Sequence, residues 1–265
     1  MAIFRRSHTS SILTSFGEDL SVSTLDVQAV FGREKDREAV HKLFEHGALR
    51  VLLVGPEGVG KTVIMRTTRL ESKRPHIFHV GAWAATLFPR DAVSHLDELK
   101  VAVNDSKHLF LLLPDIHQLF HVFRDAEIMN SFIFEFSQML AISRVCCLAT
   151  ATTYSNHFDI ERSPLGTLFE RVVVEETDPI VTVAILEERR AQIERETGAQ
   201  FSHERMKEAV ALSDRYIFES YLPNKAIELM RAAAFHAVAT RGAGAQVQRD
   251  DLLLPVCEMT GLTLL

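Results

Sequence analysis

The sequence predicts an α/β fold in which a parallel five-stranded sheet is flanked by helices and followed by a small C-terminal all-helical domain. Five short apolar runs have the length and composition of buried central strands. Amphipathic helical stretches separate them, and such alternation is typical of a parallel sheet covered on both faces. After Glu176 no strand-like run of similar strength follows, and the remaining sequence has helical patterns.

The predicted strands are 50–54, 76–80, 109–113, 145–149 and 171–175. Helical spacing precedes the first strand, where Gly47 ends the pattern, and precedes the fourth, where apolar residues recur every four positions between Ile128 and Leu140. We expect an N-terminal extension over 1–24, a large α/β domain over 25–177 and a small helical domain over 178–265.

The first helix of the C-terminal domain has signals at both ends. Asp178 suits a helix cap, Pro179 suits the first turn, and Gly198 suits the end. Two further helical patterns follow, one around Met206 and Val210 and one from about Ile227 to Val238. The stretch 240–246 is predicted to be a loop.

Composition argues against several classes of protein. The 265 residues include 29 Lys and Arg against 35 Asp and Glu, so the net charge of −6 gives no global attraction for nucleic acid or anionic lipid. Two of three cysteines lie in an apolar run, which suits reduced thiols. No apolar run approaches the ~20 residues of a membrane span. We expect a cytoplasmic protein that binds neither nucleic acid nor membrane.

The strongest functional motif lies between the first strand and a helix. Its GxxxxGK[ST] spacing provides backbone N–H groups for phosphate oxygens, a lysine for the β- and γ-phosphates and a hydroxyl for Mg²⁺. We name residues 55–62 the phosphate-binding loop. They are Gly55, Pro56, Glu57, Gly58, Val59, Gly60, Lys61 and Thr62. The sequence therefore predicts a P-loop NTPase that binds ATP or ADP with Mg²⁺.

The flanking residues resemble the first ATPase module of the Clp unfoldases, which belong to the AAA+ class. The resemblance runs from about Leu13 to Val238 and rests on residues 13–21, on the Gly-Arg turn within 30–38 and on a lid-helix signature over 212–230. It implies that Val30 and Phe31 contact adenine. It also implies that Leu222, Pro223 and Ile227 close over the nucleotide, and that Thr152 or Thr153 senses the γ-phosphate.

The acidic pair after the third strand departs from this family. Where the family has Asp-Glu, one residue for the metal and one for the attacking water, this chain has Pro114-Asp115. Asp115 is then one methylene shorter than the residue that polarises water. A one-residue shift would place Asp115 at the metal, but it would turn the side chain to the other face of the strand. In either alignment Asp115 is the candidate and one of the two roles is empty.

Two further segments depart from the family pattern. The family has two arginines before a phenylalanine, where this chain has Thr167 and Leu168 before Phe169, with Arg171 displaced. The pore-loop tyrosine is absent from 83–96, where Phe88 is the aromatic that could replace it.

The resemblance leaves two main functions open. The first is an ATP-binding Clp-like module that forms a homo- or hetero-oligomeric ring, acts as a chaperone in ATP-dependent remodelling of a protein substrate, and hydrolyses ATP slowly. The second is a catalytically inactive, nucleotide-binding regulatory or scaffold subunit. A DNA-handling relative would require a basic face, which the composition does not supply.

Overall fold

The computed structural model describes residues 17–19, 31–68, 76–80, 92–105 and 109–262, which form two compact units. The second unit contains residues 175–262 together with two short segments, 31–34 and 56–60. The sequence prediction had placed both segments in the large domain. They join the helical unit because Gly32 packs against Val181 and Gly58 packs against Asn224.

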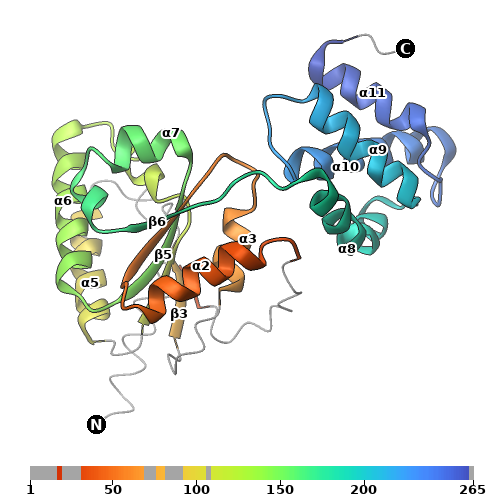
Figure 1. The fold of residues 1–265 in the computed structure, drawn as a ribbon. Coiled ribbons are helices and arrows are strands. Elements are labelled where there is room, and N and C mark those ends of the chain that lie inside the picture. Colours follow the sequence, from red (N-terminus) through yellow and green to blue (C-terminus); the bar gives the residue numbers. More distant parts are fainter. Residues whose placement is uncertain (1–16, 20–30, 69–75, 81–91, 106–108, 263–265) are drawn as a thin grey trace. The chain divides into compact units, whose positions relative to one another are not determined.

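The first unit contains the sheet (Figure 1). Its strands are β1 (Gly17–Asp19), β2 (Arg50–Val54), β3 (His76–Val80), β4 (Leu109–Leu113), β5 (Cys146–Ala151) and β6 (Glu170–Val173). Its α-helices are α2 (Glu34–Glu45), α3 (Lys61–Thr67), α5 (Ala92–Asp105), α6 (Ala126–Ile142) and α7 (Thr153–Ser155). Shorter helical turns are η1 (Ile116–Phe120), η2 (Asn156–Ile160) and η3 (Pro164–Thr167).

The strand order is β1-β3-β4-β5-β2-β6. The five predicted strands all form, and they run parallel to one another. The sixth, β1, was not predicted and pairs antiparallel with β3 at the edge of the sheet. The carboxyl ends of β2, β4 and β5 therefore meet at one edge, where α/β sheets commonly bind ligands.

Helices cover both faces of the sheet, as predicted. Figure 1 shows α5 and α6 on one side and α2 and α3 on the other. Along β4, Leu109, Leu111 and Leu113 belong to the core cluster that includes α5 and α6 residues. The intervening Phe110 meets Phe44 of α2 edge to face, with ring centroids 5.5 Å apart. Burial on both faces explains why the strand reads as an unbroken apolar run.

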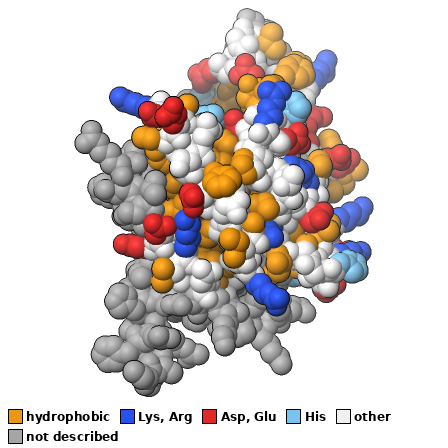
Figure 2. All heavy atoms as spheres, turned by 90° about the vertical axis from the view of Figure 1, so that its left-hand side faces the viewer, with side chains coloured by type: hydrophobic (Ala, Val, Ile, Leu, Met, Phe, Trp, Pro, Cys, Tyr) orange, Lys and Arg blue, Asp and Glu red, His pale blue; other side chains and the backbone are white. Residues whose placement is uncertain are grey.

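The outer face of α5 and α6 mixes apolar and charged side chains (Figure 2). Val101, Phe134 and Ile142 are exposed there. Between the helices, Lys100 bonds Glu135 at 2.8 Å and also contacts Asp97 of its own helix. This ion pair links the two helices across the surface.

The second unit is a four-helix unit made of α8 (Pro179–Thr197), α9 (His203–Tyr216), α10 (Asn224–Arg241) and α11 (Arg249–Thr260). Asp178 caps α8 by accepting the Ile180 N–H at 2.7 Å, and Gly198 ends it with a φ of 78°. Both predicted boundaries of α8 are therefore correct. The fourth helix was not predicted, because Pro255 interrupts its sequence pattern.

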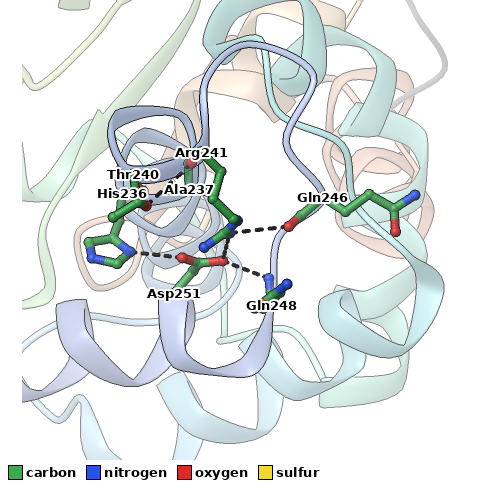
Figure 3. A network of polar contacts seen from close by, with 7 residues as sticks. All are labelled: His236, Ala237, Thr240, Arg241, Gln246, Gln248 and Asp251. Atoms are coloured by element: carbon green, nitrogen blue, oxygen red, sulfur yellow. Dashed lines mark hydrogen bonds and ion pairs between the residues drawn. The ribbon is translucent and has the colours of Figure 1, made fainter.

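A buried carboxylate joins α10 to α11 (Figure 3). Asp251 is 1% exposed and accepts hydrogen bonds from the Arg241 guanidinium, from the Gln248 backbone N–H at 2.7 Å and from His236 at 2.8 Å. Burial alone would raise the pKa of Asp251, but the bonds from Arg241, Gln248 and His236 together hold it below its ordinary value. The ionised carboxylate is thus the form that this packing favours.

None of the helices within the described ranges is both long and apolar enough to cross a membrane.

Candidate functional site

The phosphate-binding loop is attached to the sheet at both of its ends. Gly55 follows β2 and donates its N–H to the Ala151 carbonyl at the end of β5, at 3.3 Å. Lys61 begins α3 and is 6% exposed, and its ammonium donates to the Gly55 carbonyl at 2.8 Å. The lysine therefore folds back towards the first residue of the loop.

The middle of the loop, residues 56–60, packs within the second unit. Gly58 has a φ of 85°, and a Cβ there would lie 2.8 Å from Asn224 Cβ. Gly60 has a φ of 100°. The loop thus has glycine at both of its left-handed positions, of which Gly60 belongs to the motif, and at Gly58 no side chain fits.

Arg33 holds this part of the loop, a role that the sequence analysis did not predict. Its guanidinium is buried and donates to the Val59 carbonyl and, at 2.8 Å, to the Glu175 carbonyl. The arginine therefore ties the phosphate-binding loop to the segment that leads into α8. Arg33 follows Gly32 in the Gly-Arg turn, and that turn is the sequence feature that could have identified it.

A buried lysine also bonds the segment that leads into α8. Lys225 of α10 pairs with Glu176 at 3.1 Å and with Asp214 at 3.5 Å. Glu176 also accepts the Leu222 backbone N–H at 2.6 Å. These bonds fix the start of α10 against residue 176. The lid-helix signature contains Lys225, but its partner is 49 positions earlier in the chain, which a local pattern cannot identify.

Asp115 lies just beyond the end of β4 and has a left-handed backbone, with φ 47° and ψ 48°. Its backbone N–H donates to the hydroxyl of Thr150 in β5 at 2.8 Å, and that hydroxyl is 3.3 Å from the Asp115 carboxylate. A non-glycine residue in this conformation costs about 1–3 kcal/mol, although aspartate tolerates it better than most residues. The sequence indicates Asp115 as a site residue and carries no signal for Thr150.

His117 lies near this carboxylate in the turn after β4. Burial lowers its pKa; Asp115 and Asp159 act to raise it, while His121 and Lys61 lower it further. Its Nδ1 is buried and has no hydrogen-bond partner among the described residues. Neutral imidazole is therefore the form favoured in this environment.

The predicted γ-phosphate sensors follow β5 directly. Thr152 caps the short helix α7, since its hydroxyl accepts the Ser155 N–H at 3.1 Å. Thr153 is exposed in the first turn of that helix. Neither residue is the threonine that contacts Asp115.

The residues predicted to surround adenine are described only in part. Val30 lies outside the described residues. Phe31 is 48% exposed and lines a groove of about 770 Å³ in the second unit, together with Ile180, Val183 and other residues of α8 and α9. Leu222, Pro223 and Ile227 are buried and do not line that groove. A common adenine site for Phe31 and these three residues stays a prediction.

Arg171 has partners within its own chain. It donates to the Asn156 side chain at 3.2 Å and to the Gly166 carbonyl at 3.0 Å. These bonds fasten the connection between β5 and β6. Phe88, the aromatic of the predicted pore loop, lies outside the described residues.

The candidate Mg²⁺ ligands are both oxygen donors. Thr62 presents an exposed hydroxyl in the first turn of α3, and Asp115 presents a partly exposed carboxylate at the edge of the sheet. Mg²⁺ prefers oxygen ligands and keeps several waters, so one carboxylate and one hydroxyl beside phosphate oxygens fit this ion.

Known proteins match both parts of the chain. Residues 178–252 match the AAA lid domain family. ClpC of Staphylococcus aureus, an ATP-dependent Clp protease ATP-binding subunit, is 27% identical over 246 residues, which are 86% of this chain and 30% of the relative. The chaperone ClpB of Prochlorococcus marinus is 26% identical over 239 residues, which are 84% of this chain and 28% of the relative. This chain resembles a Clp-type AAA+ module.

The fold agrees with that assignment. The Hsp104–ADP complex of S. cerevisiae matches with a TM-score of 0.79 at 19% identity, over 94% of this chain and 45% of the other. An extended Hsp104–casein complex matches with a TM-score of 0.74. The Clp-like chain spans about 30% of the length of the relatives it matches in sequence. The predicted AAA+ fold with a helical lid is therefore confirmed.

Proposed function

We propose that this Clp-like chain binds ATP with Mg²⁺, hydrolyses it slowly and works as one module of a ring that remodels proteins. The observation that carries the proposal is the phosphate-binding loop, with left-handed glycines at positions 58 and 60 and Lys61 folded over the Gly55 carbonyl. Its backbone N–H groups and ammonium suit a triphosphate. The matched relatives, a Clp protease ATP-binding subunit and a chaperone, support ATP as the nucleotide.

We expect slow hydrolysis because of the residues that follow the carboxyl end of β4. Pro114 stands where a second carboxylate would hold the metal's water shell, and only Asp115 remains to order the attacking water. A displacement of about 1 Å at such a group costs about 100-fold in rate. The absence of arginines at Thr167 and Leu168 acts in the same direction, because such arginines contribute about 10³-fold or more.

The remaining predicted residues keep their proposed roles in this account. Thr62 would hold Mg²⁺, joined by Asp115 in the alternative alignment, and Thr152 or Thr153 would contact the γ-phosphate. Phe31, Leu222, Pro223 and Ile227 would lie near the base, together with Val30. A ring of identical or related subunits and a protein substrate remain the proposed partners.

Phosphate release by the purified protein tests the proposal. We expect slow release by the wild type, a loss of at least about 10-fold in Asp115→Asn, and a gain of similar size in Pro114→Asp. Asparagine accepts the left-handed backbone, so Asp115→Asn changes the charge and leaves the turn intact. Binding of a fluorescent ATP analogue serves as the control and should change by less than about 3-fold in both variants.

Two outcomes would contradict parts of the proposal. Release that is equal in the wild type and in Asp115→Asn would remove Asp115 from the mechanism. ATP binding without measurable release in the wild type or in Pro114→Asp would favour the regulatory or scaffold subunit.

A further inference from the structure

Strand β5 extends beyond the end of its neighbour β4. Leu113 is the last residue of β4 and pairs with Ala149, while β5 continues to Ala151. Thr150 therefore lies beside the turn that follows β4, where its hydroxyl meets Asp115. Thr150 is 0% exposed, so its hydroxyl cannot turn towards bulk water.

The hydroxyl of Thr150 forms a reciprocal pair with Asp115. It accepts the Asp115 backbone N–H at 2.8 Å, and its own hydrogen points to the carboxylate oxygen at 3.3 Å. The first bond fixes the left-handed backbone of Asp115, and the second restrains its side chain. The turn itself does not use that carboxylate, since η1 begins without a side-chain cap.

The same strand also contacts the phosphate-binding loop. Ala151, the next residue, accepts the Gly55 N–H. Gly55 in turn accepts the Lys61 ammonium. The end of β5 therefore holds Asp115 on one side and the base of the loop on the other, at adjacent positions.

We infer that Thr150 is a positioning residue that sets the direction of the Asp115 carboxylate relative to the phosphate-binding loop. The inference rests on the proposed ATPase function, and the role is distinct from the γ-phosphate contact proposed for Thr152 or Thr153. The Thr152 hydroxyl accepts a hydrogen bond that caps α7, whereas the Thr150 hydroxyl accepts the backbone N–H of Asp115. With Pro114 in place of a second carboxylate, the position of this single carboxylate controls the rate.

Two substitutions separate the hydroxyl from the packing. Thr150→Val keeps the shape and the β-branch in a buried strand and removes the hydroxyl, and Thr150→Ser keeps the hydroxyl. Ser137→Ala is the matched control, because Ser137 is also buried in the first unit and its hydroxyl bonds the Phe134 carbonyl within α6. Thermal unfolding of each variant checks that it folds.

We expect Thr150→Val to slow turnover and to leave nucleotide binding nearly unchanged. The rate of phosphate release at saturating ATP falls at least about 10-fold in Thr150→Val, while the dissociation constant of a fluorescent ATP analogue changes by less than about 3-fold. Thr150→Ser and Ser137→Ala stay within about 3-fold of the wild type in both measurements. Unchanged or faster release in Thr150→Val, or an equal loss in Ser137→Ala, would overturn the inference.

Crystal structures of the nucleotide-free wild type, Thr150→Val and Thr150→Ser provide a readout that needs no turnover. Asp115 is expected to leave the left-handed region or to turn its carboxylate in Thr150→Val and to keep its wild-type position in Thr150→Ser. An unchanged Asp115 in Thr150→Val would overturn the inference whatever the kinetics. If the wild type releases no phosphate, the proposed function fails, and the crystal structures alone decide whether Thr150 positions Asp115.

Discussion

Of the two left-handed glycines in the phosphate-binding loop, Gly58 is the one at which an added Cβ would lie closer to a neighbour. Its φ of 85° is strained for any residue with a Cβ, and the added atom would lie 2.8 Å from Asn224. We expect Gly58→Ala to displace the loop and to weaken binding of an ATP analogue at least about 10-fold, since the backbone N–H groups would leave their positions. Fluorescence titration measures this loss.

Gly47→Ala is the matched control for that substitution. Gly47 has a similar φ of 93°, but no atom lies within 4 Å of the position of its Cβ. This variant should lose about 1 kcal/mol of stability through strain and retain its affinity. Equal affinity losses in both variants would mean that general destabilisation, and not the shape of the loop, explains the effect.

The sequence identifies those candidate functional residues whose neighbours along the chain form a recognisable pattern. The loop is recognised from one strand, one spacing and one helix, and Asp115 is recognised from the end of the third predicted strand. Thr150 and Arg33 were missed because their partners depend on strand register and on packing between distant segments. No pattern along the sequence indicates that β5 extends two residues past the end of β4.

Among the elements, α8 was predicted at both ends because its cap, first-turn proline and terminal glycine act locally. The helices α5 and α11 were not predicted. In α11, Pro255 lies inside the helix and the buried Asp251 stands where an apolar residue would be expected. The carboxylate is buried there only because Arg241 and His236 of α10 reach it (Figure 3).

The stability of the α10–α11 pair should therefore depend on Asp251. We expect Asp251→Asn to lower the free energy of unfolding by about 2 kcal/mol at pH 7, because a charged hydrogen-bond acceptor is lost from a buried network. The pKa of Asp251 is lowered by folding, so its contribution is complete above the ordinary value of 3.8 and is lost as the pH falls through the folded value. The difference between wild type and variant should be constant from pH 7 to about 5 and shrink below about 3.8.

Urea unfolding at several pH values measures this difference. Asp250→Asn is the control, since Asp250 is the exposed neighbour in the same first turn of α11. A loss of stability as large in Asp250→Asn, or one that grows as the medium becomes more acidic, would contradict the role given to the buried network.

For the whole molecule, the phosphate-binding loop is divided along the chain, with Gly55, Lys61 and Thr62 in the first unit and residues 56–60 in the second. If the chain works as a ring module, ATP should promote its assembly. We expect the mass in solution to rise from 29.8 kDa to a multiple of that value when a slowly hydrolysed ATP analogue and Mg²⁺ are added.

Size-exclusion chromatography with light scattering measures that mass. Lys61→Ala should remain at its nucleotide-free mass under the same conditions, because it lacks the phosphate contact. A wild type that binds the analogue and stays monomeric would contradict the ring and leave a nucleotide-binding subunit that depends on a different partner chain.

The central claim is that Lys61 and the surrounding backbone bind the phosphates of ATP. Titration of a fluorescent ATP analogue into the wild type, Lys61→Ala and Lys42→Ala tests it most directly, since Lys42 is an exposed lysine of α2 paired with Glu38. We expect saturable binding by the wild type and by Lys42→Ala and a loss of affinity of about 100-fold in Lys61→Ala. Equal affinity in all three proteins, or no binding by the wild type, would contradict it.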